Sequence, residues 1–187
     1  QANPGDLRYS SGSRNNLPHM VIAKVLQSYG VVAQNVPYSQ DGNAIKDLKG
    51  GVLDFAFVNV GNYIADKSAF NIMLVLSELA GAKASYDGAP SIVDLGIDTG
   101  LTGLAPMGWT WWIVNADTPE AEVTKLRAAM TAAMQRPDVR AAIEAVGFVP
   151  LDWDHTQYDA IVGPVAGQLG AMGNALDWEA EELKKLN

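Results

Sequence analysis

Short apolar runs alternate with amphipathic stretches through the first half of the chain. Brief apolar runs bounded by polar residues predict strands, whereas apolar residues three or four apart predict helices. Val21, Val25 and their neighbours have helical spacing, and Asn16 and Pro18 suit the start of that helix. The predicted order is strand 7–10, helix 17–29, strand 33–37, helix 43–49, strand 52–58, short helix 63–67 and strand 72–76. This alternation favours an α/β fold with a largely parallel sheet.

The second half of the chain has a different pattern. Residues 80–108 are rich in Gly, Pro, Ser, Asp and Thr, which indicates a long irregular connection. A strand is predicted over 109–115, and helical spacing follows almost to the end. One strand cannot cover the apolar faces of these helices, which include Val123, Leu126, Met130, Ile143, Ile161, Val165 and Leu169. We expect cover from the first half, from a second copy of the chain or from a separate N-terminal fragment.

Charge and composition exclude several functions. The formal net charge of the 187 residues is −8, which argues against nucleic acid and against anionic membrane surfaces. It does not exclude a small anionic ligand, because a few backbone N–H groups can hold one carboxylate. The chain has no Cys, so it has neither disulfides nor thiolate metal sites. Asp152, Asp154 and His155 are metal-ligand types, but we predict a turn and helix cap there, without metal or cofactor.

Polar loops follow three of the predicted strands. In an open parallel sheet, ligands bind beyond the carboxyl ends of the strands, so these loops are expected to line one cleft. Hydroxyls and backbone N–H groups at a helix N-terminus suit a carboxylate. The candidate ligand-binding residues in these loops are Ser11, Gly12, Ser13, Asn16, Tyr38, Gly42, Asn43 and Asn59. Asn16 also suits a simple helix cap, and Tyr38 equally suits a half-buried aromatic at a strand end.

His19 and Trp109 are two further candidates. His19 lies in the first helical turn beside the Ser loop, where it suits a hydrogen-bonded structural role or contact with a ligand. The alternative is an α/β hydrolase-like enzyme that uses Ser11 or Ser13 with His19. No third orienting group or G-x-S-x-G elbow supports it, so we expect no catalysis. Trp109 would lie on one face of its strand, where an aromatic ring could stack on a ligand or pack within the protein.

Several longer motifs follow one another along the chain. They are residues 3–12 with His19, Val-Pro-Tyr at 36–38, Leu-Lys-Gly-Gly-Val-Leu-Asp at 48–54, Ala-Pro-Ser-Ile-Val-Asp-Leu-Gly at 89–96, Thr-Pro at 118–119 and Arg-Pro-Asp-Val-Arg at 136–140. In this order and spacing they resemble the solute receptors of the tripartite tricarboxylate transporter family, also called Bug proteins. The resemblance spans nearly the whole chain, although the N-terminal region of the family has no counterpart here.

The resemblance implies both an architecture and a function. The architecture is a periplasmic-binding-protein-like two-lobed fold of type II. Residues 1–105 would form one whole ligand-binding lobe, and residues 106–187 the C-terminal part of the other. The implied function is a periplasmic receptor, not an enzyme, that captures a small carboxylate or related polar organic ligand between its lobes. Membrane transporter subunits would then receive the ligand.

Overall fold

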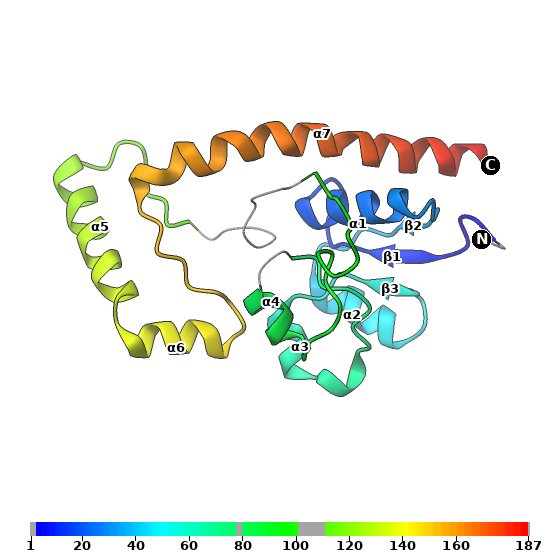
Figure 1. Ribbon diagram of the computed structural model, residues 1–187, viewed down its shortest axis with the longest axis horizontal. Coiled ribbons are helices and arrows are strands. Elements are labelled where there is room, and N and C mark those ends of the chain that lie inside the picture. The colour runs from blue at the N-terminus through cyan, green and yellow to red at the C-terminus, as the bar shows by residue number, and fades with distance from the viewer. Residues whose placement is uncertain (1–2, 78–79, 101–110, 187) are drawn as a thin grey trace.

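A computed structural model describes residues 3–77, 80–100 and 111–186 of the chain (Figure 1). A small sheet with its connecting helices forms the N-terminal part, which we call the sheet lobe (residues 3–100). The long helix α7 (Tyr158–Lys185) lies along one side of it, and the two chain ends lie near each other. Residues 111–154 form an arm that carries α5 (Glu120–Met134) and α6 (Pro137–Ala145) away from the sheet lobe.

Three parallel strands form the sheet, in the order β2-β1-β3. Their bounds are β1 Arg8–Ser10, β2 Gln34–Asn35 and β3 Phe55–Ala56. Arg8 pairs with Gln34, and Tyr9 pairs with both Asn35 and Phe55. The strands lie where the sequence predicts them but are shorter. The strand expected at 72–76 is reduced to one parallel bridge between Val75 and Ser91.

Helices connect the strands and begin at the carboxyl ends of the strands. They are α1 (Leu17–Ser28), α2 (Asp41–Lys49) and α3 (Val60–Ala65), followed by the 3-10 turn η1 (Lys67–Ala69). The start of α2 precedes the predicted start by two residues, so Gly42 lies inside the first helical turn and not in a loop. The connection expected to be irregular contains one short helix, α4 (Ala80–Ser85).

The core lies where α1 is held between the sheet and α7. Val21 of α1 packs with Val165 and Met172 of α7 in one cluster. On the sheet side, Tyr9 and Ile22 pack together with Ala33 and the partly buried rings of Phe55 and Phe57. From Val165 onward, α7 therefore lies on the sheet lobe, which is one of the positions expected for the apolar faces of the C-terminal helices.

The arm is far less buried. No side chain between 111 and 154 is buried, and Trp112 is 79% exposed. The strand predicted over 109–115 is wrong for residues 111–115, because no neighbouring strand in the described part of the chain pairs with them. After α6 the chain returns to the sheet lobe, where a Cβ on Gly147 would collide with Val60. The predicted lobe boundary at 105–106 lies outside the described residues.

A capped turn precedes α7. Asp154 accepts from the backbone N–H of Thr156 and forms a capping box with Gln157, at the start of the 3-10 turn η2 (His155–Gln157). The predicted turn and cap are thus confirmed. Within the described ranges, no helix combines the length and apolar character needed to cross a bilayer.

Candidate functional site

Segments 11–16, 36–40 and 57–59 follow β1, β2 and β3, and we call these three segments the loop edge. The backbone N–H of Tyr38 donates to Gly12 O over 3.0 Å, which joins the first two segments. Asn59 Nδ2 donates to Asp41 Oδ2 over 3.2 Å, which joins the third segment to the start of α2. The structure therefore brings together the three loops that the sequence indicates. The N-termini of α1, α2 and α3, with their partial positive charge, all begin here.

The Ser loop at 11–16 turns sharply before α1. Gly12 and Asn15 both have left-handed backbone angles, with φ of 81° and 59°. Asn16 Oδ1 caps α1 by accepting from the His19 N–H over 2.9 Å, and Asn16 Nδ2 donates to Ser11 O over the same distance. The side chain of Asn16 is thus engaged within the loop as a cap.

Two backbone donors in this loop are unused. The N–H groups of Ser13 and Arg14 have no partner among the described residues, and both side chains are exposed. The N–H of Gly12 is already taken by Ser10 Oγ at 3.1 Å. Adjacent free N–H groups ahead of a helix N-terminus are an arrangement that can hold an anionic oxygen.

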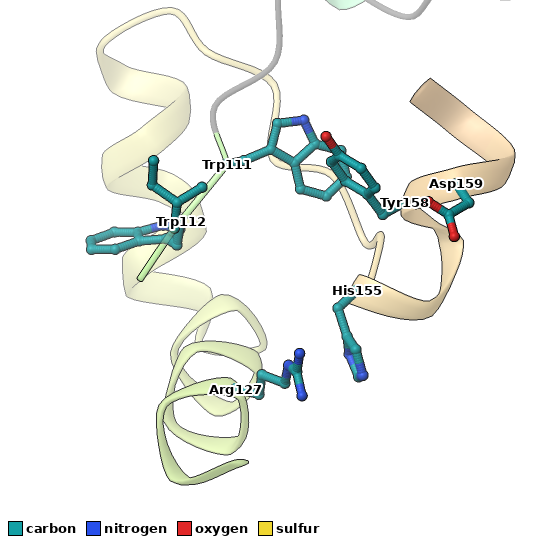
Figure 2. Close-up of a pocket in the computed structure, with 7 residues that line it drawn as sticks. Trp111, Trp112, Arg127, His155, Tyr158 and Asp159 are labelled. Carbon is teal, nitrogen blue, oxygen red and sulfur yellow. The ribbon is translucent and has the colours of Figure 1, made fainter. Parts of the chain in front are cut away.

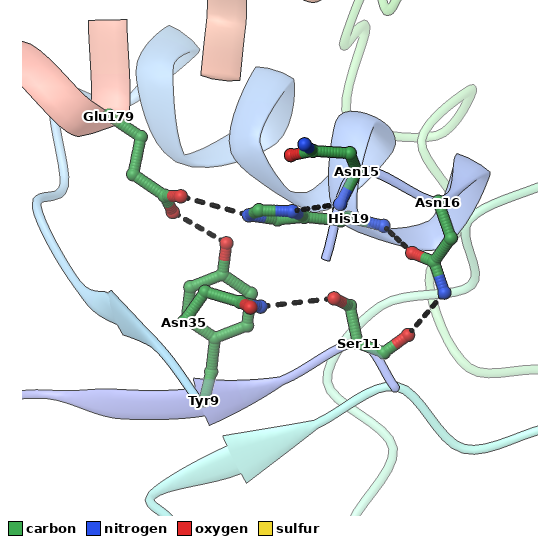
Figure 3. Close-up of polar contacts among 7 residues, drawn as sticks. All are labelled: Tyr9, Ser11, Asn15, Asn16, His19, Asn35 and Glu179. Atoms are coloured by element: carbon green, nitrogen blue, oxygen red, sulfur yellow. Dashed lines mark hydrogen bonds and ion pairs between the residues drawn. The ribbon is translucent and has the colours of Figure 1, made fainter. Parts of the chain in front are cut away.

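Ser11 differs from Ser13 in its surroundings. Its hydroxyl is buried and accepts from Asn35 Nδ2 over 3.0 Å (Figure 3). The other side-chain atom of that amide, Asn35 Oδ1, is buried without a partner in the described part of the chain. Ser11 therefore connects the loop to Asn35 in the interior, whereas Ser13 faces solvent.

The start of α2 adds both donors and a negative charge. Gly42 and Asn43 are exposed in its first turn, and no side chain caps this helix. Asp41 precedes them, and a Cβ added at Gly12 would lie 3.6 Å from Asp41 Oδ1. The loop edge thus has free N–H groups with the carboxylate of Asp41 next to it, so the electrostatic character of the region is mixed.

Tyr38 and Asn59 make structural contacts at this edge. Tyr38 donates its hydroxyl to Asp47 Oδ2 over 2.6 Å, and this hydrogen bond to a carboxylate raises the pKa of Tyr38. Asn59 Oδ1 caps α3 by accepting from the Asn62 N–H over 2.9 Å. Both side chains therefore help to fix the loop edge, and both remain partly exposed.

His19 is buried beneath the Ser loop in a polar cluster (Figure 3). Its Nδ1 accepts from the Asn15 N–H over 3.0 Å, and its Nε2 lies 2.9 Å from Glu179 Oε2. Because Nδ1 serves as an acceptor, Nε2 must carry the proton that is donated to Glu179. Tyr9 donates to the other oxygen, Glu179 Oε1, over 2.5 Å. Burial and then this hydrogen bond hold the pKa of Tyr9 well above its usual range.

This cluster removes the geometric basis of the hydrolase alternative. Among the described residues, neither Ser11 nor Ser13 forms a hydrogen bond with His19, and both ring nitrogens of His19 are already occupied. A base that cannot reach the hydroxyl cannot activate it.

The aromatic candidate Trp109 lies outside the described residues. Its neighbour Trp111 packs edge-on against Tyr158, with ring centroids 5.1 Å apart. Trp111 and Tyr158 border a hollow of about 350 Å³ between α5 and the start of α7, which Arg127 and His155 also line (Figure 2). No residue of this hollow belongs to the loop edge.

Three residues of this region were not predicted from the sequence. Asp41 was detectable in principle, because an acidic residue in a first helical turn is favoured by the helix dipole. Glu179 follows Val165 and Met172 at intervals of seven, so it is a charged residue on an apolar helical stripe. Asn35 carries no comparable signal, because a polar residue at a strand end is common.

Comparison with known proteins gives one family. The sequence profile described as "Tripartite tricarboxylate transporter family receptor" matches residues 1–176. A curated relative, the "UPF0065 protein in tcbD-tcbE intergenic region" of Pseudomonas sp. (strain P51), is 24% identical over 147 residues. That alignment covers 78% of this chain and 42% of the relative, so the chain spans less than half of its length.

Two solved structures share the fold. A TctC solute binding protein from Polaromonas, solved without ligand, superposes with a TM-score of 0.62 at 20% identity. The match covers 91% of this chain and 58% of that one. A protein described as a periplasmic transporter has a TM-score of 0.55 at 23% identity, over 100% of this chain and 57% of its own. These likenesses confirm the predicted fold class.

Proposed function

The chain belongs to the tripartite tricarboxylate transporter receptor family, and from this premise we propose that its loop edge binds a carboxylate group of a small organic solute. The family is one of receptors, which agrees with the expectation that the chain is not an enzyme. In this proposal the protein acts in the periplasm and passes its solute to a membrane transporter.

The observation that carries the proposal is the pair of free N–H groups at Ser13 and Arg14. They stand ahead of the α1 N-terminus, and Asp41 at the uncapped start of α2 lies next to Gly12 of the same loop. N–H groups in this position stabilise an anionic oxygen through hydrogen bonds and the helix dipole. The exposed hydroxyl of Ser13 and the side chains of Asn43 and Asn59 supply further polar contacts.

The proposed mechanism is capture without bond cleavage. The solute carboxylate would meet the loop edge first, and closure of a second lobe over it would exclude water, as in other two-lobed binding proteins. Asp41 sets a limit on the solute, because a second carboxylate near it would be repelled. We therefore expect a hydrogen-bond donor or a neutral group on the part of the solute that faces Asp41.

Titration calorimetry with acetate, succinate and citrate tests this proposal. At least one acid should bind, and Ser13→Ala should weaken its binding by about 1.5 kcal/mol or more, because the backbone N–H groups remain but the hydrogen bond from the Ser13 hydroxyl to the carboxylate is lost. Ser28→Ala is the matched control, since Ser28 is an exposed serine near the opposite end of α1. Equal affinity in the Ser13 and Ser28 variants would overturn the site assignment.

A second variant, which removes the charge of Asp41, extends the same experiment. Asp41→Asn keeps the size of the side chain and removes the negative charge, so it should strengthen binding of the acids, most of all citrate. The gain should shrink as salt is added, because the interaction is near the surface. Weaker binding of all three acids by this variant would contradict the proposed placement of the solute carboxylate.

A further inference from the structure

We propose that Glu179 of α7 is a positioning residue for the loop edge, which it controls through His19 and Asn15. The effect that we expect on ligand binding rests on the proposed carboxylate site, whereas the effect that we expect on the conformation of Asn15 does not. Glu179 lies 160 residues after His19 in the sequence, and α7 brings its carboxylate next to the His19 ring, across that ring from Asn15 (Figure 3). Glu179 forms no hydrogen bond or ion pair with the described residues of the loop itself.

Two hydrogen bonds on opposite sides of the His19 imidazole ring connect Glu179 to Asn15. We call this connection the relay. Glu179 Oε2 accepts from His19 Nε2 over 2.9 Å, and His19 Nδ1 accepts from the Asn15 N–H over 3.0 Å. His19 and Glu179 are only 4% and 5% exposed, so water does not compete for these bonds. The carboxylate fixes the proton on Nε2, and this leaves the lone pair of Nδ1 for the loop.

The contact with His19 supports a less common backbone conformation at Asn15. Its φ of 59° lies in the left-handed region, which asparagine adopts more readily than most residues other than glycine but which still favours a position held by neighbouring contacts. Asn15 directly follows Arg14, whose N–H is one of the two free donors. The hydrogen bond to His19 thus fixes the turn that presents these donors to a ligand.

The composition of α7 supports a role beyond packing. Val165, Met172 and Ala175 share the buried stripe with Glu179, and they already attach α7 to the sheet lobe. A buried ionisable group is generally no better for stability than an apolar residue of similar size. A carboxylate at this position instead supplies two acceptors at once, one for His19 and one for Tyr9.

Glu179→Gln tests the relay because an amide has one acceptor oxygen in place of two and carries no charge. If the new NH2 group faces His19, then Nε2 must become the acceptor and the ring proton moves to Nδ1, where it opposes the Asn15 N–H. If the amide oxygen faces His19 and the NH2 group faces the Tyr9 hydroxyl, Nε2 keeps an acceptor but loses the charged one, which makes Nδ1 a weaker acceptor for the loop. In each arrangement the bond to Asn15 is weakened or lost, so the Asn15 amide should exchange with solvent faster, by up to roughly tenfold.

The control variant is Met172→Ala, which weakens the attachment of α7 without touching His19. Both variants are compared at urea concentrations that give equal unfolding free energies. Nitrogen NMR of the His19 ring should show a changed tautomer or a weakened Nε2 bond in Glu179→Gln only, and fast Asn15 exchange in that variant only. Equal Asn15 exchange in the two variants would show that Glu179 acts only through stability and would overturn the proposal.

Two further measurements separate this proposal from the proposed function. The wild-type His19 ring should carry its proton on Nε2, and the opposite tautomer would overturn the relay even if Glu179→Gln fails to fold. Acetate, succinate and citrate are then titrated into wild type and both variants. If the NMR results hold but no acid binds wild type, the carboxylate site fails and the relay stands. If an acid binds, Glu179→Gln should weaken its binding roughly tenfold relative to Met172→Ala.

Discussion

Helices α1 and α5 both carry apolar residues at helical spacing, but their surroundings are very different. In α1, Val21, Ile22 and Ala23 are buried between the sheet and α7. In α5, no side chain is buried, and Leu126 at the predicted apolar face is 48% exposed. Apolar spacing therefore predicts which face of a helix can be buried, whereas burial itself requires a second element that packs against that face.

The sheet lobe and the arm differ in the same way. Val21, Met172 and Tyr9 belong to two clusters that share the partly buried Leu76, so α1, α7 and the sheet form one continuous core. Within the arm, α5 packs mainly on α6. We therefore expect global stability to depend on the sheet lobe with α7, and the arm to contribute little.

The largest difference between the two regions should follow from shortening one methionine in each. Met172 is 2% exposed, so Met172→Ala should lower the free energy of unfolding by about 2–5 kcal/mol through lost burial and a residual cavity. Met130, on α5, is only partly buried, and Met130→Ala should cost well under half as much. Urea unfolding measures both values. Equal losses of unfolding free energy would show that Met130 is packed in the arm as tightly as Met172 is in the core.

The next effect concerns the hydroxyl of Tyr9. Tyr9→Phe leaves the buried Glu179 without one of its two side-chain donors, and the free energy of unfolding should fall by about 1–3 kcal/mol. Tyr158→Phe, at an exposed position facing the arm, should change it by less than about 0.5 kcal/mol. A similar loss from both variants, measured by urea unfolding, would contradict the importance of the buried cluster.

The raised pKa of Tyr9 also predicts a pH dependence. The neutral phenol is favoured in the folded state, so its stabilising contribution is complete below the unfolded pKa near 10 and declines as the pH rises above it. The thermal midpoint of wild type should therefore fall more steeply above pH 10 than that of Tyr9→Phe. Parallel curves for the two proteins across this pH range would refute the prediction.

The smallest effect should come from the helix caps. Asn16→Ala removes the cap of α1 and should lower the free energy of unfolding by about 1 kcal/mol, because α1 belongs to the core. Asp154→Ala removes the cap of η2 next to the arm, where local fraying costs little global stability. Thermal unfolding should show a clear shift only for Asn16→Ala. A larger shift for Asp154→Ala would reverse the ranking of the two regions.

Local patterns in the sequence predicted much of the sheet lobe. Asn16 and Pro18 correctly marked the start of α1, and the strands were found near their true positions. The same kind of reasoning failed for residues 111–115, since a strand requires a hydrogen-bonded partner that no local pattern specifies. The first two residues of α2 were missed because Gly42 favours a loop when its neighbours are unknown.

The sequence by itself determined the alternation of strands and helices, the loops that follow the strands and the family resemblance, because these depend on spacing between nearby residues. Only the tertiary structure decided the partners of His19, since Glu179 reaches it from a helix 160 residues away. It also decided that Ser11 is buried while Ser13 is exposed. Periodicity acts over a few residues, whereas burial and hydrogen-bond partners depend on which distant segments meet in space.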